Sequence, residues 1–397
     1  MNEPNVMINN FTEEISDSSP TLNQPYFEEP AILLIARLTI EVAFAFVGLL
    51  GNALVSFVIS KQCKFRSGLK LFIRNLAFAD IGILAISFPI AVVKEQLPLY
   101  WPFGRVVCLY FYPLAEVFHG VSVWSITAIA IERYRKIATG VRSSSYISTK
   151  PLKWGIFLIW VVSFLVVSLP LLFVMDFLEL NTGTFCVVAW SRTMHNIYII
   201  SLTIFWYLLP LGIIVFTYVK ISRQIQQSNK FHRSSIKRRS GERKVENVAM
   251  RFTEERKRMK QNSKAKKILT PIVLVFTISM LPLNVLRVLL LVWEEIVFER
   301  YFLLIYNVCV IGVVMNSAAD PLIYSIVSKD FRLELKEVFS RFTQRLQNLI
   351  KLRRDDKNGD LNINNASGAK DNGHLRERAF SPEHKQNDEN AILVTPV

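Results

Sequence analysis

The sequence predicts an all-α membrane protein, a bundle of seven transmembrane helices followed by an amphipathic eighth helix. Three observations predict this fold: apolar blocks of spanning length, a one-sided distribution of basic residues, and an amphipathic segment after the last block. The blocks are apolar all round, whereas a surface helix of a soluble protein keeps a polar face. About 20 apolar residues match the hydrocarbon core of a bilayer. This distribution excludes a soluble enzyme.

Seven segments qualify as spans, and they are 31–60, 69–93, 106–138, 152–175, 194–220, 266–293 and 302–327. Residues 1–30 have neither the basic nor the apolar region of a signal peptide, so we expect the first span to direct its own insertion. The predicted domains are an extracellular tail (1–30), the bundle (31–328) with a long basic third intracellular loop (about 225–263), the eighth helix (329–346) and a cytoplasmic tail (347–397).

Lys and Arg gather on one side of the membrane. The connection 220–267 holds 17 Lys and Arg residues against four acids, whereas residues 1–30 contain six acids and no Lys or Arg. Because basic loops remain in the cytoplasm, we expect a plasma-membrane protein with its N-terminus outside. The net charge of +15 then indicates topology and contact with anionic membrane lipids, not binding to nucleic acid.

The two ends of the chain carry weaker signals. Asn10 begins an N-glycosylation sequon on the predicted outer face, although such sequons also arise by chance. Apolar residues on one face of 329–346 predict a helix on the membrane surface, and a solvent-exposed helix is the alternative. The polar tail 347–397 predicts disorder. Its last residues, Thr395-Pro396-Val397, fit a ligand for a PDZ protein, a pattern that three residues match easily by chance.

Polar side chains lie at mid-membrane depth in several spans. An ionisable group inside a span costs about 2.5–3.5 kcal/mol on insertion scales, so function is the default hypothesis. Asp80 and Asp320 stand out, and with their polar neighbours they can hold a small cation or a water network. The structural alternative is a hydrogen-bond cluster that joins helices. The set comprises Asn52, Asp80, Ser122, Asn316, Ser317 and Asp320.

Short motifs follow one another along the spans. They are Gly51-Asn52 with Val55, Leu76-Ala77-Phe78-Ala79-Asp80, Trp101-Pro102-Phe103-Gly104 before Cys108, Glu132-Arg133-Tyr134, Trp160 with Pro170, Pro210 with Tyr218, Phe276 with Pro282, and Asp320-Pro321-Leu322-Ile323-Tyr324. Over residues 31–345 the chain resembles a class A (rhodopsin-like) G-protein-coupled receptor. One such match is weak, whereas the whole set in order and at the proper depths is specific.

The resemblance implies a disulfide between Cys108 and Cys186, both of which face the oxidising outside of the cell. It also implies that the polar set around Asp80 is the sodium and water network of such receptors. An allosteric sodium ion at Asp80 is the only expected cofactor.

The resemblance implies a G-protein coupling switch where the third span meets the cytosol. Similar receptors hold the motif's arginine by its neighbouring acid at rest and release it to the heterotrimeric G protein; arrestin is a further expected partner. A basic anchor at a helix end is the alternative. The switch residues are Glu132, Arg133, Tyr134, Tyr218, Pro321 and Tyr324. Pro282 removes a backbone hydrogen bond and provides the pivot of the sixth span.

Two positions depart from the family pattern. The family's toggle tryptophan, two residues before Pro282, is Met280 here, so the bulky aromatic of the sixth span is missing. Many members also carry an acid at the cytosolic base of this span that pairs with the arginine of the third. The stretch 260–264 contains no acid, and we therefore expect basal activity.

The outer halves of the third and sixth spans carry the candidate ligand pocket. Tyr112, Glu116 and His119 are spaced to lie on one helix face. For His119 alone, the alternative is a hydrogen-bonded interior residue without a ligand contact. Glu116 and Arg287 are costly to bury, so they are either ligand contacts, which we favour, or a mutual salt bridge. The predicted pocket comprises Tyr112, Glu116, His119, Met280, Asn284 and Arg287.

The ligand class follows from the resemblance. Aminergic receptors carry an aspartate where this chain has Ala115, and opsins carry a lysine where it has Val314. The chain looks most like peptide receptors of the neuropeptide Y, orexin and galanin type, so we expect an extracellular neuropeptide; a lipid or other small molecule is the alternative. An ion-coupled transporter is less favoured because the chain lacks repeated halves. No enzyme motif is present in the sequence.

Overall fold

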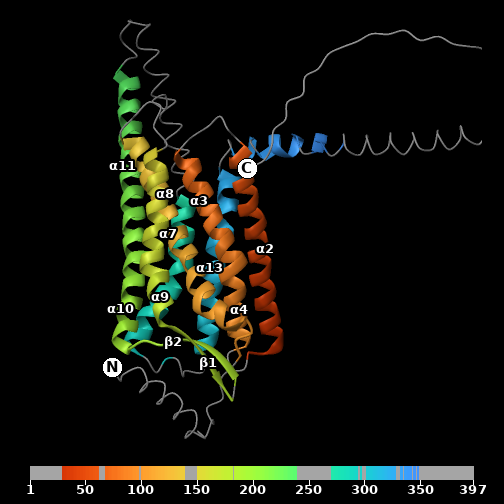
Figure 1. Cartoon of the computed structure of the whole chain (residues 1–397). Helices are drawn as coiled ribbons and strands as arrows, with labels where there is room; N and C mark the ends of the chain where they lie inside the picture. The colour runs from red at the N-terminus through yellow and green to blue at the C-terminus, as the bar shows by residue number, and fades with distance from the viewer. Residues whose placement is uncertain are drawn as a thin grey trace, which may run out of the picture. The chain divides into compact units, whose positions relative to one another are not determined.

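The computed structural model describes residues 29–61, 68–97, 100–138, 150–181, 183–238, 270–293, 296, 301–327, 331–333, 335–341, 343–345 and 347. The chain divides into two compact units, Met1–Lys336 and Glu337–Val397. The first holds a bundle of long helices with a two-stranded sheet at one end (Figure 1). The predicted glycosylation site Asn10, the stretch 260–264 and the C-terminal Thr395-Pro396-Val397 lie outside the described residues.

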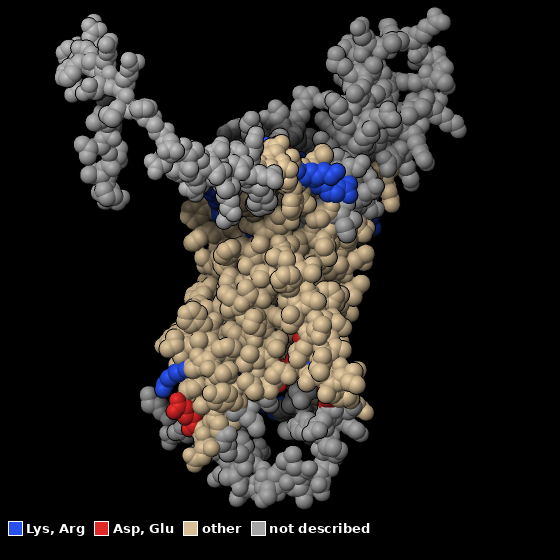
Figure 2. All heavy atoms as spheres, turned by 90° about the vertical axis from the view of Figure 1, so that its right-hand side faces the viewer, with Lys and Arg blue, Asp and Glu red and all other residues tan. Residues whose placement is uncertain are grey.

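Among the described residues, seven helices are long and apolar enough to cross a membrane, which confirms the predicted bundle of seven spans. They are Ala31–Lys61, Gly68–Gln96, Gly104–Ile137, Lys150–Val174, Arg192–Gln227, Thr270–Val292 and Leu304–Ile323. Large apolar side chains such as Ile32, Phe173 and Val292 are at least 80% exposed, as expected for contacts with lipid tails. The face of the bundle seen in Figure 2 has a broad region of uncharged side chains across its middle.

Most spans consist of several consecutive elements. The first is α2 (Ala31–Lys61), and the second joins α3 (Gly68–Gly82), η1 (Ile83–Ser87) and α4 (Phe88–Gln96). The third joins α5 (Gly104–Val106), η2 (Val107–Phe111), α6 (Tyr112–Ala115) and α7 (Val117–Ala138), and the fourth joins α8 (Lys150–Ser163), η3 (Phe164–Ser168) and α9 (Leu169–Val174). The fifth joins α10 (Arg192–Thr203), η4 (Ile204–Leu208) and α11 (Leu209–Arg238), the sixth is Thr270–Val292, and the seventh is α13 (Phe302–Val327).

Prolines explain the interruptions in the second to fifth spans. The elements η1, η2, η3 and η4 are π-helical turns, and each ends two residues before a proline. In η1, for example, the N–H of Phe88 donates to the carbonyl of Ile83, five residues earlier, and Pro89 follows. A proline ring clashes with the carbonyl four residues back, and the wider π turn relieves that clash. The four turns were not predicted from the sequence.

Buried polar and small residues hold the spans together. Trp160 Nε1 donates to Asn75 Oδ1 at 2.9 Å, and Asn75 Nδ2 donates to Ser125 Oγ at 2.8 Å, so α3, α7 and α8 share one network. A Cβ atom added at Gly312 of α13 would lie 2.4 Å from the carbonyl oxygen of Ser279. The sixth and seventh spans therefore touch backbone to backbone, which small residues allow.

A hairpin joins the fourth and fifth spans at the end of the bundle where the third span begins. Strand β1 (Met175–Leu180) pairs antiparallel with β2 (Gly183–Val188). The predicted disulfide is present between Cys108 of η2 and Cys186 of β2, so the hairpin is fastened to the third span. The N–H of Trp101 also donates to the carbonyl of Thr184 at 2.8 Å. The sequence predicted the disulfide through the family resemblance, but not the strands.

The helices after the membrane-spanning region are described in part. Helix α11 continues to Arg238, so the first part of the predicted third intracellular loop is helical. The described residues between 331 and 347 are helical, and Phe331 is buried. Arg341 pairs with Glu337 one turn earlier. Attachment of this segment to a membrane surface stays a prediction.

Candidate functional site

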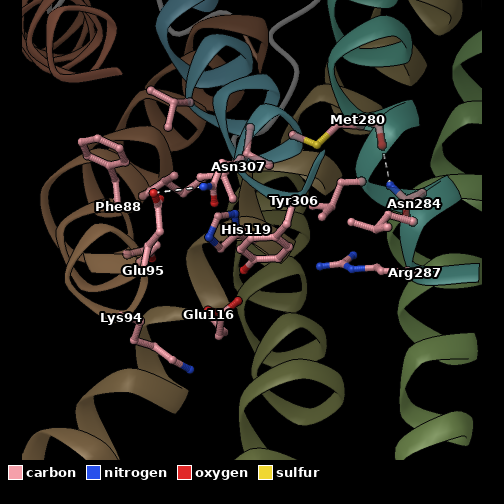
Figure 3. Close-up of a pocket in the computed structure, with 18 of the residues that line it drawn as sticks. Phe88, Lys94, Glu95, Glu116, His119, Met280, Asn284, Arg287, Tyr306 and Asn307 are labelled. Carbon is pink, nitrogen blue, oxygen red and sulfur yellow. Dashed lines mark hydrogen bonds between the residues drawn. The ribbon is translucent and has the colours of Figure 1, made fainter. Parts of the chain in front are cut away.

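A cavity of about 760 Å³ lies among the spans, near the end of the bundle where α2 begins. This volume is within the usual range of about 300–1,000 Å³ for ligand sites. All six predicted pocket residues line it: Tyr112, Glu116, His119, Met280, Asn284 and Arg287. Figure 3 shows five of them around one space, all except Tyr112. The structure therefore brings together residues from the third and sixth spans, and their contact with a ligand stays a prediction.

Local backbone features place the polar residues of the wall. Glu116 interrupts the third span between α6 and α7, and its carbonyl accepts from the N–H of His119 at 3.2 Å. In the sixth span, Asn284 Nδ2 donates to the carbonyl of Met280 at 2.8 Å, while Asn284 Oδ1 is buried and lacks a hydrogen-bond partner. That oxygen can accept a hydrogen bond from a ligand in the cavity.

The two charged pocket residues do not form the salt bridge that the sequence left open. Among the described residues, no ion pair within 4.0 Å joins Glu116 to Arg287. In Figure 3 the guanidinium of Arg287 extends into the cavity from the sixth span. On the opposite side, Lys94 Nζ lies 4.6 Å from the ring centroid of Tyr112. Arg287 and Glu116 are thus available to oppositely charged ligand groups.

A second charged cluster, which the sequence analysis missed, forms another part of the wall. We call it the acidic corner: Glu29, Arg37, Glu41, Glu95 and Asn307. Arg37 Nη2 donates to Glu29 Oε2 at 3.0 Å and also to Glu95, while Arg37 Nη1 donates to Glu41 Oε1 at 3.0 Å. Asn307 Nδ2 donates to Glu95 Oε1 at 3.1 Å (Figure 3). The corner therefore connects the first, second and seventh spans.

One sign of this cluster is visible in the sequence: two charged residues lie within one apolar span. Arg37 and Glu41 lie one turn apart within α2, and both are nearly fully buried. The insertion cost that singled out Asp80 applies equally to them. Their partners Glu95 and Asn307 lie in distant segments, so the contacts themselves become visible only in the fold.

The floor of the cavity meets the polar set at mid-membrane depth. Ser122 lines the cavity and donates to Asp80 Oδ1 at 2.9 Å, and Asp320 is buried in α13. Asn52 Nδ2 donates to the carbonyl of Ser317 at 2.9 Å.

Part of this polar set remains unsatisfied. Ser279 Oγ lies 3.4 Å from Asn316 Oδ1, which connects the sixth span to the seventh. Three buried oxygen atoms have no hydrogen-bond partner: Asp80 Oδ2, Ser317 Oγ and Asp320 Oδ2. Hard cations prefer carboxylate, hydroxyl and carbonyl oxygens, so the donors present fit a sodium ion.

A tryptophan of the fifth span lies on the cavity wall together with Met280. Trp206 of η4 is buried and lines the cavity. A Cβ on Gly120 would lie 2.4 Å from Trp206 Nε1, so the indole packs directly on the third span. The fifth span therefore places a bulky aromatic group on the cavity wall, whereas the sixth span places Met280 there.

The predicted switch residues lie at the other end of the bundle. Glu132, Arg133 and Tyr134 are in the last turns of α7, and the ring centroid of Tyr134 lies 6.4 Å from that of Phe216. Thr270 Oγ1 lies 3.5 Å from the Tyr218 hydroxyl, between the sixth and fifth spans. Pro321 and Tyr324 belong to α13. The roles of these residues in coupling stay predictions.

Comparison with known proteins agrees with this architecture. Residues 51–324 match the family described as 7 transmembrane receptor (rhodopsin family). Galanin receptor type 1 of Rattus norvegicus is 29% identical over 74% of this chain and 79% of that receptor. Neuropeptide Y receptor type 6 of Oryctolagus cuniculus is 27% identical over 84% of this chain and 88% of that receptor. The chain belongs to the rhodopsin family of seven-transmembrane receptors.

Proposed function

We propose that the chain is a plasma-membrane receptor that binds a peptide from outside the cell and activates a heterotrimeric G protein inside it. The observation that carries this proposal is a large cavity of mixed charge in a member of the rhodopsin family. The matched relatives are named as receptors for galanin and neuropeptide Y, which supports a peptide as the ligand class. The N-terminus is then extracellular, in agreement with the distribution of basic residues.

The polarity of the wall favours a peptide over a lipid. Glu95, Glu116 and Arg287 line the cavity from three different spans. Contact with a lipid tail would remove these charges from water without replacing their interactions, which is costly. A peptide carries amide groups and charged groups along one chain, and it can meet such scattered partners together. A small molecule with several polar groups is the second candidate.

The proposed mechanism connects the cavity to the cytosolic end. A ligand that presses on Trp206 and Met280 would act on the fifth and sixth spans, and Pro282 lets the inner half of the sixth span pivot. The displacement would release Arg133 for contact with the G protein. Arrestin, and a PDZ protein at the C-terminus, are further proposed cytosolic partners.

A sodium ion at the polar core is part of the same proposal. Asp80, Ser122, Ser317 and Asp320 would hold the ion and stabilise the resting arrangement of the spans. We expect sodium to lower the affinity for an agonist peptide in the wild type, and Asp80→Asn to remove this effect. An equal sodium effect in both forms would contradict the assignment.

Pools of C-terminally amidated synthetic peptides test the ligand class. Cells that express the full chain should show G-protein dissociation with at least one pool. Arg287→Gln should raise the half-maximal concentration about tenfold or more, because it removes a charged contact. The control is Arg105→Gln, an exposed arginine outside the cavity wall, which should leave it unchanged. Equal responses of all three forms would contradict a ligand bound at Arg287.

A further inference from the structure

We propose that the acidic corner binds a basic group of the ligand, an ammonium or a guanidinium. The inference rests on the proposed receptor function and specifies the chemistry of its ligand. Glu29, Arg37, Glu95 and Asn307 all line the cavity, so a bound ligand can reach them. Glu41 lies behind them, nearly fully buried in α2.

The charges of the corner do not balance. Three carboxylates, Glu29, Glu41 and Glu95, surround the single guanidinium of Arg37, each within 3.3 Å of it. When all are ionised, the corner carries a net charge of −2. A charge imbalance at a site shielded from water is far costlier than at the surface, so a further cation is attracted there.

Lys94 does not supply that cation. It precedes Glu95 in sequence, but its ammonium lies over the ring of Tyr112. In Figure 3 the side chain extends away from Glu95 and Asn307. Among the described residues, no ion pair within 4.0 Å joins Lys94 to a carboxylate of the corner.

Arg37 has no hydrogen-bonding capacity left. A guanidinium has five N–H groups, one on Nε and two on each terminal nitrogen. Nε donates to Glu29, Nη1 donates to Glu41 and Glu95, and Nη2 donates to Glu29 and Glu95. All five donors are therefore engaged with carboxylates, and any acceptor still unpaired in the corner needs a donor from elsewhere.

One such acceptor lies on the cavity wall. Asn307 is only 5% exposed, and its Nδ2 donates to Glu95. Its other atom, Oδ1, is buried and has no hydrogen-bond partner, and the same holds for Glu41 Oε2 behind it. Buried acceptors are nearly always satisfied in folded proteins. An N–H of a cationic ligand group would satisfy Asn307 and compensate the excess negative charge at once.

The rest of the cavity has the opposite sign. Away from the corner, its wall carries Lys94 and Arg287 against Glu116, a net charge of +1. This separation orients a ligand: its basic group lies between the first, second and seventh spans, and a carboxylate or carbonyl group faces Arg287. Electrostatic complementarity of this kind discriminates between ligands more than it adds affinity.

Three small probes show whether the acidic corner binds an ammonium or a guanidinium. Argininamide carries an ammonium and a guanidinium, N-acetyl-argininamide keeps only the guanidinium, and citrullinamide keeps only the ammonium. Each is titrated against the purified full-length receptor in detergent, and the rise in unfolding temperature with concentration gives an apparent Kd. We expect argininamide to stabilise the receptor, and the single-cation probe that retains the effect identifies the group bound.

Variants show whether the probe binds at the corner. Glu95→Gln should raise the apparent Kd for argininamide at least about tenfold. If that variant does not fold, Glu29→Gln, two residues before the first span, serves the same purpose. Glu179→Gln removes an exposed acid of β1 outside the cavity wall and should leave the Kd unchanged.

Arg37→Gln distinguishes a ligand subsite from a purely structural clamp. The substitution removes the internal cation, so argininamide should bind more tightly than to the wild type. A clamp without a ligand role predicts no gain in affinity.

The inference is overturned if argininamide fails to stabilise the wild type, or if Arg37→Gln shows no gain in affinity. It is also overturned if Glu95→Gln, or Glu29→Gln in its place, has the same Kd for argininamide as the wild type. The binding test does not depend on G-protein activation. If a peptide pool activates the G protein but argininamide does not bind, the inference is wrong and the proposed function still stands. If argininamide binds but no peptide pool activates the G protein, the inference stands and the proposed function is wrong.

Discussion

Asn75 shows how single side chains hold this bundle together. It accepts a hydrogen bond from Trp160 and donates one to Ser125, at 2.9 Å and 2.8 Å. The indole also packs near Phe78 and Phe118, with ring centroids 5.9 Å away in both cases. A polar group inside a bundle can therefore be structural, and Asn75 is not part of the cavity wall.

Asn75→Ala should lower the free energy of unfolding by about 1–3 kcal/mol, because the indole N–H of Trp160 loses its partner. Thermal unfolding of the purified receptor measures the loss. The double variant with Trp160→Phe should lose less free energy of unfolding than the sum of the losses in the two single variants, since both changes remove the same hydrogen bond. Fully additive effects would contradict the proposed role of this bond.

At the scale of elements, close approach of backbones decides how the sixth and seventh spans pack. A Cβ at Gly312 would meet the carbonyl oxygen of Ser279 at 2.4 Å, and a backbone atom cannot move aside as a flexible side chain can. At Gly212 in α11, a Cβ would meet nothing within 4 Å. The two glycines are therefore a matched pair for testing this contact.

Gly312→Ala should destabilise the receptor by about 1–3 kcal/mol through overpacking, with reduced surface expression. Gly212→Ala should be as stable as the wild type or slightly more stable, because alanine has a higher helix propensity than glycine. Unfolding temperature and cell-surface labelling measure both. A Gly312→Ala receptor as stable as Gly212→Ala would show that the two spans do not touch backbone to backbone.

The sequence predicted the elements unequally well. Long apolar blocks located all seven spans, since a bilayer requires a minimum length of apolar helix. The π turns before Pro89, Pro113, Pro170 and Pro210 were missed. A proline clashes with the backbone carbonyl four residues earlier, but a kink or a π turn can each relieve this clash, so the sequence does not tell which one forms. The hairpin β1–β2 was missed because two short strands with mixed polarity carry little periodic signal.

At the scale of the whole molecule, contacts between distant segments escaped prediction. The six pocket residues came from spacing on two spans and from the family resemblance, and all six line one cavity. The acidic corner needs Arg37, Glu95 and Asn307 from three spans at once, and no local pattern connects them. Trp206 was missed for the same reason, because only the fold places it on the same cavity wall as Met280.

The receptor as a whole should signal without ligand, because the stretch 260–264 has no acid to hold Arg133 at rest. Asn262→Glu should restore such a partner and lower basal G-protein dissociation several-fold at equal surface expression. Asn262→Gln is the neutral control and should keep the basal level of the wild type. Unchanged basal signalling in Asn262→Glu would contradict the role assigned to the missing acid.

The central claim is that the receptor binds a peptide and then activates a G protein through Arg133. Its most direct test is the Arg133→Ala variant, which should separate peptide binding from G-protein activation. The active peptide pool is applied to cells with equal surface amounts of wild type and variant, and binding and G-protein dissociation are measured together. The account predicts that both forms bind the peptide and only the wild type activates the G protein. Equal activation by both forms, or none by the wild type with any G-protein subtype, would contradict it.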